Sequence, residues 1–123
     1  MQSITPCGHH MRRFMEICLL ELLQNGAAHG YALAEQLSGF GFQSDELKLS
    51  TLYRTLRGME QAGWVQSRWE SGGHGPKKRV YSITPKGSEA LEMWIEVLKQ
   101  RQARISKLLS VHAASIKKGG GLS

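Results

Sequence analysis

Cysteine is scarce in this sequence of 123 residues, and Cys7 and Cys18 alone do not make a disulfide framework. We therefore expect a reducing environment. No apolar run approaches the ~18 residues of a membrane span. The apolar segment 17–23 is interrupted by Glu21 and lacks a secretory cleavage pattern. No segment is repeated. These absences predict one small domain with an extra element, located in the cytoplasm and without a membrane partner.

Residues that build metal and catalytic sites are also few. Cys7, His9 and His10 lie close together, but no second cluster completes a tetrahedral metal site, so we expect no metal there. No nucleophile–base pair or carboxylate pair occurs at a recognisable spacing. In the glycine-rich segment 71–78, Gly75 is followed by proline, whereas a phosphate-binding loop needs Gly-Lys-Ser/Thr there. The sequence indicates neither an enzyme nor a cofactor.

Acidic residues are nearly missing from the segment 48–79. The whole chain has 16 basic and 10 acidic residues, a net charge of +6. Of these, segment 48–79 holds seven basic and two acidic residues, which leaves only +1 for the rest. Positive charge concentrated in one quarter of the chain predicts an acidic partner, above all nucleic acid.

This segment also contains a predicted amphipathic helix from Leu49 to Gly63. Its apolar side recurs at steps of three and four and consists of Leu49, Leu52, Leu56, Met59 and Ala62. Its other side carries hydroxyls and cations: Ser50, Thr51, Arg54, Thr55 and Arg57. Ser50 is a candidate N-cap, and Gly63 suits a left-handed helix end. The helix suits a DNA major groove; the alternative is an ordinary helix whose charged face meets water.

Helical and strand periodicity predict the remaining elements. Helices are expected over 10–24 and 31–38, with a capping or packing role for His29. Strands over 64–70 and 79–84 would form a hairpin whose tip carries Lys77 and Lys78. Thr84 as N-cap and Pro85 in the first turn would start a last helix that ends near Ile116. We interpret 1–10 as a flexible N-terminus, 11–84 as a winged helix-turn-helix domain, 85–116 as a dimerisation helix and 117–123 as a flexible tail.

The last helix predicts self-association. Its apolar seam is long, its far half would be exposed on a monomer, and such a stripe marks an association surface. The predicted interface residues are Leu91, Trp94, Ile95, Leu98, Ile105 and Leu109. A small apolar or aromatic effector could stack in a pocket of Phe14, Met15 and Trp94, although plain interface packing also explains Trp94. The alternative to a dimer is a shorter helix that covers only its own core.

Several motifs resemble the PadR-like transcriptional regulators. They are His29-Gly30-Tyr31, Thr51-Leu52-Tyr53-x-x-Leu56, Glu60-x-x-Gly63, Val65-x-Ser67-x-Trp69, and the run from Lys78 through Tyr81, Thr84 and Gly87 to Leu91. The resemblance implies a winged helix-turn-helix repressor that dimerises through its C-terminal helix and binds inverted repeats of double-stranded DNA. It is closest to the family's short members, which have a single C-terminal helix.

The resemblance also implies roles for individual residues. Tyr53 would lie against the DNA backbone, Thr51 would face the groove, and Lys78 and Arg79 would lie at the base of the wing. The sequence departs from the family pattern at Ser50, where glycine is frequent, and at Arg54, where proline is frequent. These departures mean that an operator sequence cannot be transferred from other members.

We therefore predict a mainly α-helical protein with a small β-hairpin that acts as a DNA-binding regulator. The predicted DNA-binding residues are Ser50, Thr51, Tyr53, Arg54, Arg57, Lys77, Lys78 and Arg79. Cations of the hairpin and helix would contact phosphates, while Thr51, Arg54 and Ser50 would read base edges. The alternative is a winged-helix adaptor whose basic face binds an acidic protein without operator specificity.

Overall fold

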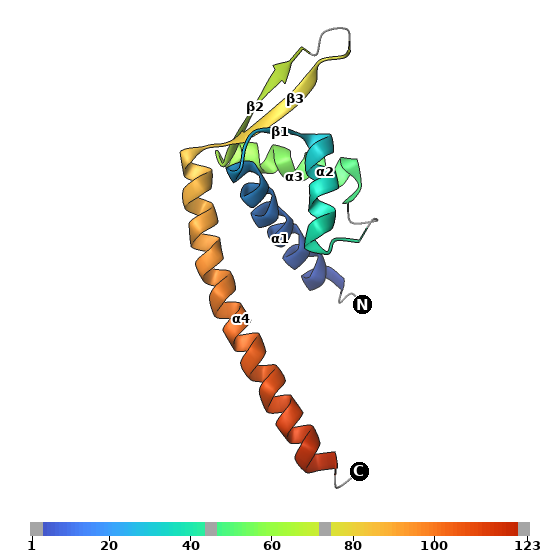
Figure 1. The fold of residues 1–123 in the computed structure, drawn as a ribbon, viewed down its shortest axis with the longest axis vertical. Helices are drawn as coiled ribbons and strands as arrows, with labels where there is room; N and C mark the ends of the chain where they lie inside the picture. The colour runs from blue at the N-terminus through green and yellow to red at the C-terminus, as the bar shows by residue number, and fades with distance from the viewer. Residues whose placement is uncertain (1–3, 44–46, 72–74, 121–123) are drawn as a thin grey trace. The chain divides into compact units, whose positions relative to one another are not determined.

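The computed structural model describes residues 4–43, 47–71 and 75–120, with side chains described from residue 12 to residue 116 within these ranges. The chain divides into two compact units, Met1–Leu91 and Glu92–Ser123. The helices and strands, labelled in Figure 1, follow in this order: α1 (Ile4–Gln24), β1 (Ala28–His29), α2 (Gly30–Leu37), the short 3-10 helix η1 (Ser38–Phe40), α3 (Leu49–Gln61), β2 (Val65–Glu70), β3 (Lys78–Ile83) and α4 (Pro85–Gly120). This confirms the predicted class, mainly helical with a small sheet.

The core of the first unit lies between α1, α2 and α3. Their fully buried side chains are Leu19, Leu20, Leu23, Leu33, Leu37, Leu52, Leu56 and Met59. The connector after α2 adds Phe42, which is buried and has its ring centroid 5.7 Å from that of Phe14. Removing this apolar surface from water is the main force that holds the three helices together.

The buried side of α3 differs from the predicted one at two positions. Thr55 is 2% exposed, whereas Leu49 is 42% exposed. A threonine can be buried here because its hydroxyl donates a hydrogen bond of 2.8 Å to the Thr51 carbonyl, which satisfies its only donor. The helix also begins two residues earlier than a Ser50 cap requires: Lys48 occupies the N-cap position and makes no side-chain cap bond. Ser50 is therefore a helical residue rather than the cap.

Several element ends also differ from those expected. Helix α1 begins at Ile4 instead of His10, so the backbone of the predicted flexible segment is helical from Ile4 onward. Pro6 is compatible with this start because the first helical N–H groups have no partner within the helix. Helix α4 ends at Gly120, beyond Ile116. Residues 1–3 and 121–123 lie outside the described part, as do the side chains of residues 117–120.

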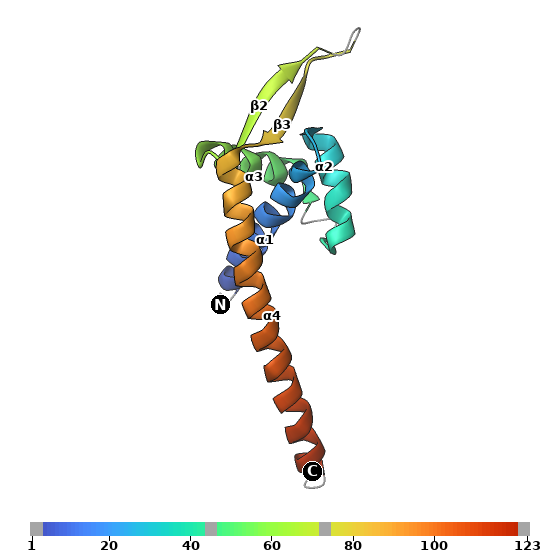
Figure 2. The ribbon, with the colours of Figure 1, turned by 60° about the vertical axis from the view of Figure 1, so that its left-hand side comes forward.

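Strand β1, between α1 and α2, joins the hairpin of β2 and β3 in a three-stranded antiparallel sheet, with strand order β1-β3-β2. The hairpin of β2 and β3 extends beyond the three helices in Figures 1 and 2. Its register pairs Ser67 with Tyr81 and Trp69 with Arg79. The short strand β1 was not predicted from the sequence. Its residue His29 pairs with Val80 and occupies the N-cap position of α2, but its side chain makes no cap bond, so of the capping or packing role expected for His29 the side-chain cap is not found.

The junction of the hairpin and α4 confirms the expected cap. The Thr84 hydroxyl accepts a hydrogen bond of 3.0 Å from the Gly87 N–H and donates one of 2.6 Å to the Gly63 carbonyl. Pro85 begins the helix. Gly63 has a φ of 84°, the left-handed conformation that glycine adopts most easily. The start of α4 is thus tied to the turn between α3 and β2.

The second unit consists of the rest of α4. Its exposed apolar side chains are Met93, Ile105, Leu108, Leu109, Val111 and Ile116. In the part of the chain that the structure describes, no helix combines the length and apolarity that crossing a bilayer requires.

Burial of Cys18 leads to a prediction about its chemistry. The side chain is 4% exposed, and burial, followed by the nearby Glu21 charge, raises the pKa of its thiol from 9.0 to about 11. Because the thiolate is the reactive form, Cys18 in a Cys7→Ser variant should react with a disulfide reagent at pH 8 about 100-fold more slowly when the protein is folded than in urea. Equal rates in the two states would show that Cys18 is accessible.

The same shift has a defined effect on stability. Because the folded-state pKa lies above the unfolded one, the contribution of the thiol to stability is complete below pH 9.0 and is lost as the pH rises to about 11. A Cys7→Ser/Cys18→Ala variant should therefore lose less stability than the Cys7→Ser variant over this alkaline range.

Candidate nucleic-acid interface

The predicted cations lie on two elements of the first unit. Arg54 and Arg57 are exposed on α3, Lys77 is exposed just before β3, and Lys78 is exposed at the start of β3. Within the described part of the chain, none of these four is paired with a carboxylate. Their charges are available to a partner from outside the chain.

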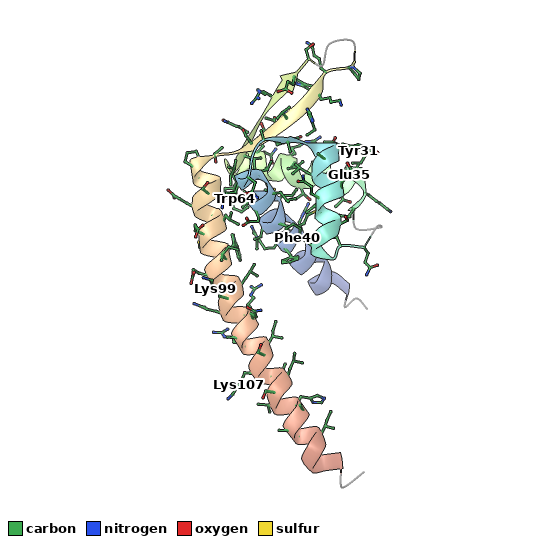
Figure 3. The ribbon with its side chains drawn as sticks, viewed as in Figure 1. Tyr31, Glu35, Phe40, Trp64, Lys99 and Lys107 are labelled. Atoms are coloured by element: carbon green, nitrogen blue, oxygen red, sulfur yellow. The ribbon has the colours of Figure 1, made fainter. Side chains whose placement is uncertain are left out.

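A groove brings several of these residues together. Its volume is about 630 Å³, and it lies between the start of α2, helix α3 and the hairpin. The lining residues are His29, Gly30, Tyr31, Ala32, Glu35, Tyr53, Arg57, Glu60, Trp69, Lys77, Lys78, Arg79 and Tyr81. Figure 3 shows Tyr31 at the end of α2 nearer the hairpin, with Glu35 one turn further along. The wall of this groove combines cations, carboxylates and aromatic rings.

Tyr53 is positioned by the glycine of the His29-Gly30-Tyr31 motif. A Cβ atom added at Gly30 would lie 2.6 Å from Tyr53 Cε1 and 2.8 Å from its hydroxyl oxygen. The tyrosine ring therefore occupies the space that any other residue at position 30 would fill. Tyr53 remains 38% exposed and lines the groove from α3.

Arg79 differs from the other predicted cations because it has protein partners. Its Nε donates a hydrogen bond of 2.9 Å to Ser67 Oγ, and its Nη2 lies 3.6 Å from Glu60 Oε1. Its guanidinium carbon lies 5.5 Å from the centre of the Trp69 ring. Beside it, burial raises the pKa of Tyr81 above its ordinary value, an effect that the Arg79 charge opposes. Tyr81 therefore stays a neutral phenol at neutral pH.

The groove does not include every predicted DNA-binding residue. Ser50, Thr51 and Arg54 are absent from its lining, although Ser50 and Arg54 are exposed on the first turns of α3. Conversely, the groove is also lined by Tyr31, Glu35, Glu60 and Trp69, which the sequence did not predict as DNA-binding residues. The His-Gly-Tyr motif and the high exposure of Tyr31 (66%) and Trp69 (62%) mark two of these as surface aromatics.

The predicted dimer interface divides into two parts. Leu91 is 1% exposed within the single chain, so it belongs to the core and has no surface left for a second chain. This part of the prediction is wrong, because a helical seam does not distinguish a chain's own core from a partner. Ile105 and Leu109, by contrast, are 56% and 61% exposed, and Trp94, Ile95 and Leu98 are partly exposed.

Two of the three residues predicted to line an effector pocket pack against other side chains of the first unit. Met15 is buried in the core, and Phe14 packs against Phe42, so both have packing roles. The groove described above is lined by none of Phe14, Met15 and Trp94. Among the described side chains, no three histidine, cysteine, aspartate or glutamate residues lie close enough together to hold a metal ion. The side chains of Cys7, His9 and His10 lie outside the described part.

Three helices followed by a β-hairpin, with a basic third helix, define a winged helix-turn-helix protein. The model of the transcriptional regulator PadR-like family matches residues 19–93. The chain belongs to this family.

Solved structures share this fold. A PadR family transcriptional regulator from Eggerthella lenta is 27% identical, with a TM-score of 0.68 over 86% of this chain and 91% of that one. A protein of Thermoplasma acidophilum described as a transcriptional regulator is 24% identical, with a TM-score of 0.73 over 83% of this chain and 96% of that one. Bacillus subtilis PadR in complex with operator DNA is 24% identical, with a TM-score of 0.60 over 68% of this chain and 47% of that one.

A sequence relative with no stated function also matches. It is an uncharacterised protein of Lysinibacillus sphaericus, 25% identical over 91 residues, which are 71% of this chain and 84% of the relative.

Proposed function

We propose that this regulator binds double-stranded DNA through α3 and the β2–β3 hairpin. The observation that supports the proposal most strongly is the shared groove: Arg57 reaches it from α3, while Lys77 and Lys78 reach it from the hairpin. Cations from two elements that converge on one surface can contact phosphates on neighbouring parts of a duplex. Such a partner would place the protein in the cytoplasm.

Two groups of residues would have different tasks. Arg57, Lys77 and Lys78 would contact phosphates and supply affinity that falls with salt. Ser50, Thr51 and Arg54, on the first turns of α3, would lie in the major groove and read base edges, because a recognition helix contacts bases mainly through its N-terminal residues. Tyr53, held against Gly30, would contact the sugar-phosphate backbone.

We infer further that the protein acts as a homodimer on an inverted repeat. The exposed apolar side chains of α4, including Ile105 and Leu109, form a stripe at helical spacing that a second copy could cover. Two-fold pairing would present two recognition helices to half-sites about 34 Å apart, one turn of DNA. A dimer bound across a promoter would exclude other proteins from it, which makes repression the expected effect.

Substitution of single cations tests the two tasks. Arg54→Ala should lower affinity for the operator more than for random DNA, because a contact to a base edge contributes ~1–3 kcal/mol of discrimination. Lys78→Ala should weaken binding to both about equally, because a phosphate contact carries no sequence information, and should reduce the salt slope by about 1 for each protomer, or about 2 for the proposed dimer. Titration of labelled duplexes at several salt concentrations measures both quantities.

The contrary result is also defined. Equal losses on operator and random DNA for both variants would refute the separate roles of Arg54 and Lys78. Tight binding to an acidic protein, combined with weak binding to every duplex, would favour the adaptor alternative.

Response to a small apolar or aromatic effector stays a prediction from the sequence. Two of its three pocket residues, Phe14 and Met15, already have packing roles in the first unit.

A further inference from the structure

A network of polar side chains connects the last turn of α3 to both strands of the hairpin. Ser67 Oγ lies 2.9 Å from Glu60 Oε2 and 3.1 Å from Oε1, and it donates its proton to this carboxylate. The same oxygen accepts the 2.9 Å hydrogen bond from Arg79 Nε. The Arg79 Nη2 atom lies 3.6 Å from Glu60 Oε1 and completes a closed set of three residues.

The hairpin register explains why these groups meet. Cross-strand partners lie on the same face of a sheet, and alternate residues of one strand share that face. The pairs Ser67–Tyr81 and Trp69–Arg79 therefore place Ser67, Trp69 and Arg79 on one side of the hairpin. Arg79 lies over the Trp69 ring, which restricts where its planar guanidinium can point.

We propose that Glu60, Ser67 and Arg79 form a clamp that sets the position of the hairpin relative to α3. This proposal rests on the proposed DNA binding and assigns Arg79 to positioning instead of phosphate contact. The clamp holds Lys77 and Lys78 at a distance from Arg57 that allows all three cations to contact phosphates of the same duplex. It uses charge-assisted hydrogen bonds, which are shorter and stronger than neutral ones.

The clamp reverses the expected effect of one charge change. Glu60 lines the groove, so its negative charge would repel DNA, and Glu60→Gln should tighten binding if charge alone mattered. With the clamp, Glu60→Gln removes the negative charge that pairs with Arg79 and should weaken binding about threefold to tenfold. Glu35→Gln is the matched control, because Glu35 lines the same groove but lies outside the clamp.

Substitutions of Arg79 and Ser67 test the clamp independently of Glu60. Arg79→Lys keeps the charge but loses the planar fork, so a clamp predicts a loss similar to that of Glu60→Gln, whereas a simple phosphate contact predicts little change. Ser67→Ala changes no charge and should weaken binding as well. Combining Glu60→Gln with Arg79→Lys should cost less than the sum of the two single losses, because both break the same contact.

The experiment titrates each variant with a fluorescent duplex of the DNA upstream of the chain's own gene and with a random duplex, at several salt concentrations. Thermal unfolding of each variant, without DNA, shows whether the fold is retained. Weaker binding by Glu60→Gln and Arg79→Lys, with Glu35→Gln equal to or tighter than the unchanged protein, is the expected result.

Other outcomes separate the two proposals. If the unchanged protein binds with a steep salt dependence, but Glu60→Gln binds more tightly and Arg79→Lys binds equally well, the clamp is refuted and DNA binding stands. If the unchanged protein binds neither duplex, both proposals fail. Should Glu60→Gln unfold, Ser67→Ala and Arg79→Lys decide the question.

Discussion

Gly87→Ala is expected to destabilise the protein by roughly 3 kcal/mol or more, one of the largest effects of a single methyl group in this chain. A Cβ atom at position 87 would overlap the carbonyl oxygen of Trp64 and lie 2.9 Å from Ile83 Cγ1. The carbonyl has little freedom to move, because it accepts a hydrogen bond of 3.0 Å from the Thr84 N–H. The first turn of α4 would have to separate from the turn between α3 and β2.

Thermal unfolding followed by circular dichroism measures this effect. The Gly87→Ala midpoint should fall by ~10 °C or more. Gly58→Ala is the matched control: nothing lies within 4 Å of an added Cβ there, and Gly58 lies inside α3. Alanine favours the helix interior over glycine by up to ~1 kcal/mol, so Gly58→Ala should raise the midpoint. A Gly87→Ala protein that melts with the unchanged one would contradict the described junction.

The double change Ile105→Glu/Leu109→Glu should separate the proposed dimer and reduce operator affinity ~100-fold or more. Both side chains are more than half exposed in the single chain, so the charges should leave the protomer folded. Two half-sites bound by one dimer gain affinity because the second contact is intramolecular, and monomers lose that gain. Four carboxylates facing each other across an apolar seam would prevent pairing.

Sedimentation velocity and DNA titration on the same samples measure the two effects. Ser106→Glu/Ser110→Glu adds the same charge to the same helix, but positions 106 and 110 lie about 100° and 140° away from Ile105 around the axis. This control should stay dimeric and should bind DNA nearly as tightly as the unchanged protein, apart from the repulsion that its added negative charge causes. Dimers that survive Ile105→Glu/Leu109→Glu would require a different interface.

Periodicity predicted the elements of the fold where their signals are long. The three helices, the hairpin and the Thr84–Pro85 start of α4 follow from spacing and capping chemistry. Strand β1 could not be predicted, because its two residues are too few for any periodic pattern. Burial of Thr55 depends on a hydrogen bond to the Thr51 carbonyl, which a count of apolar residues does not include.

The sequence predicted the positive charge of the site but not the hydrogen bonds and ion pair within it. The excess of cations in segment 48–79 indicated that Arg57, Lys77 and Lys78 share a face, and the groove contains all three. That Arg79 is engaged by Ser67 and Glu60 depends on the hairpin register and on its approach to α3, neither of which periodicity specifies. Leu91 was misassigned because the first turns of α4 belong to the core of the first unit.

Salt dependence of duplex binding tests the central claim most directly. The unchanged protein is titrated with the DNA upstream of its own gene over a range of salt concentrations. Roughly six to ten phosphate contacts per dimer predict a linear fall of log K with log salt, with a slope of about −5 to −9. A slope near zero, or no binding at low salt, would contradict a basic groove that contacts DNA.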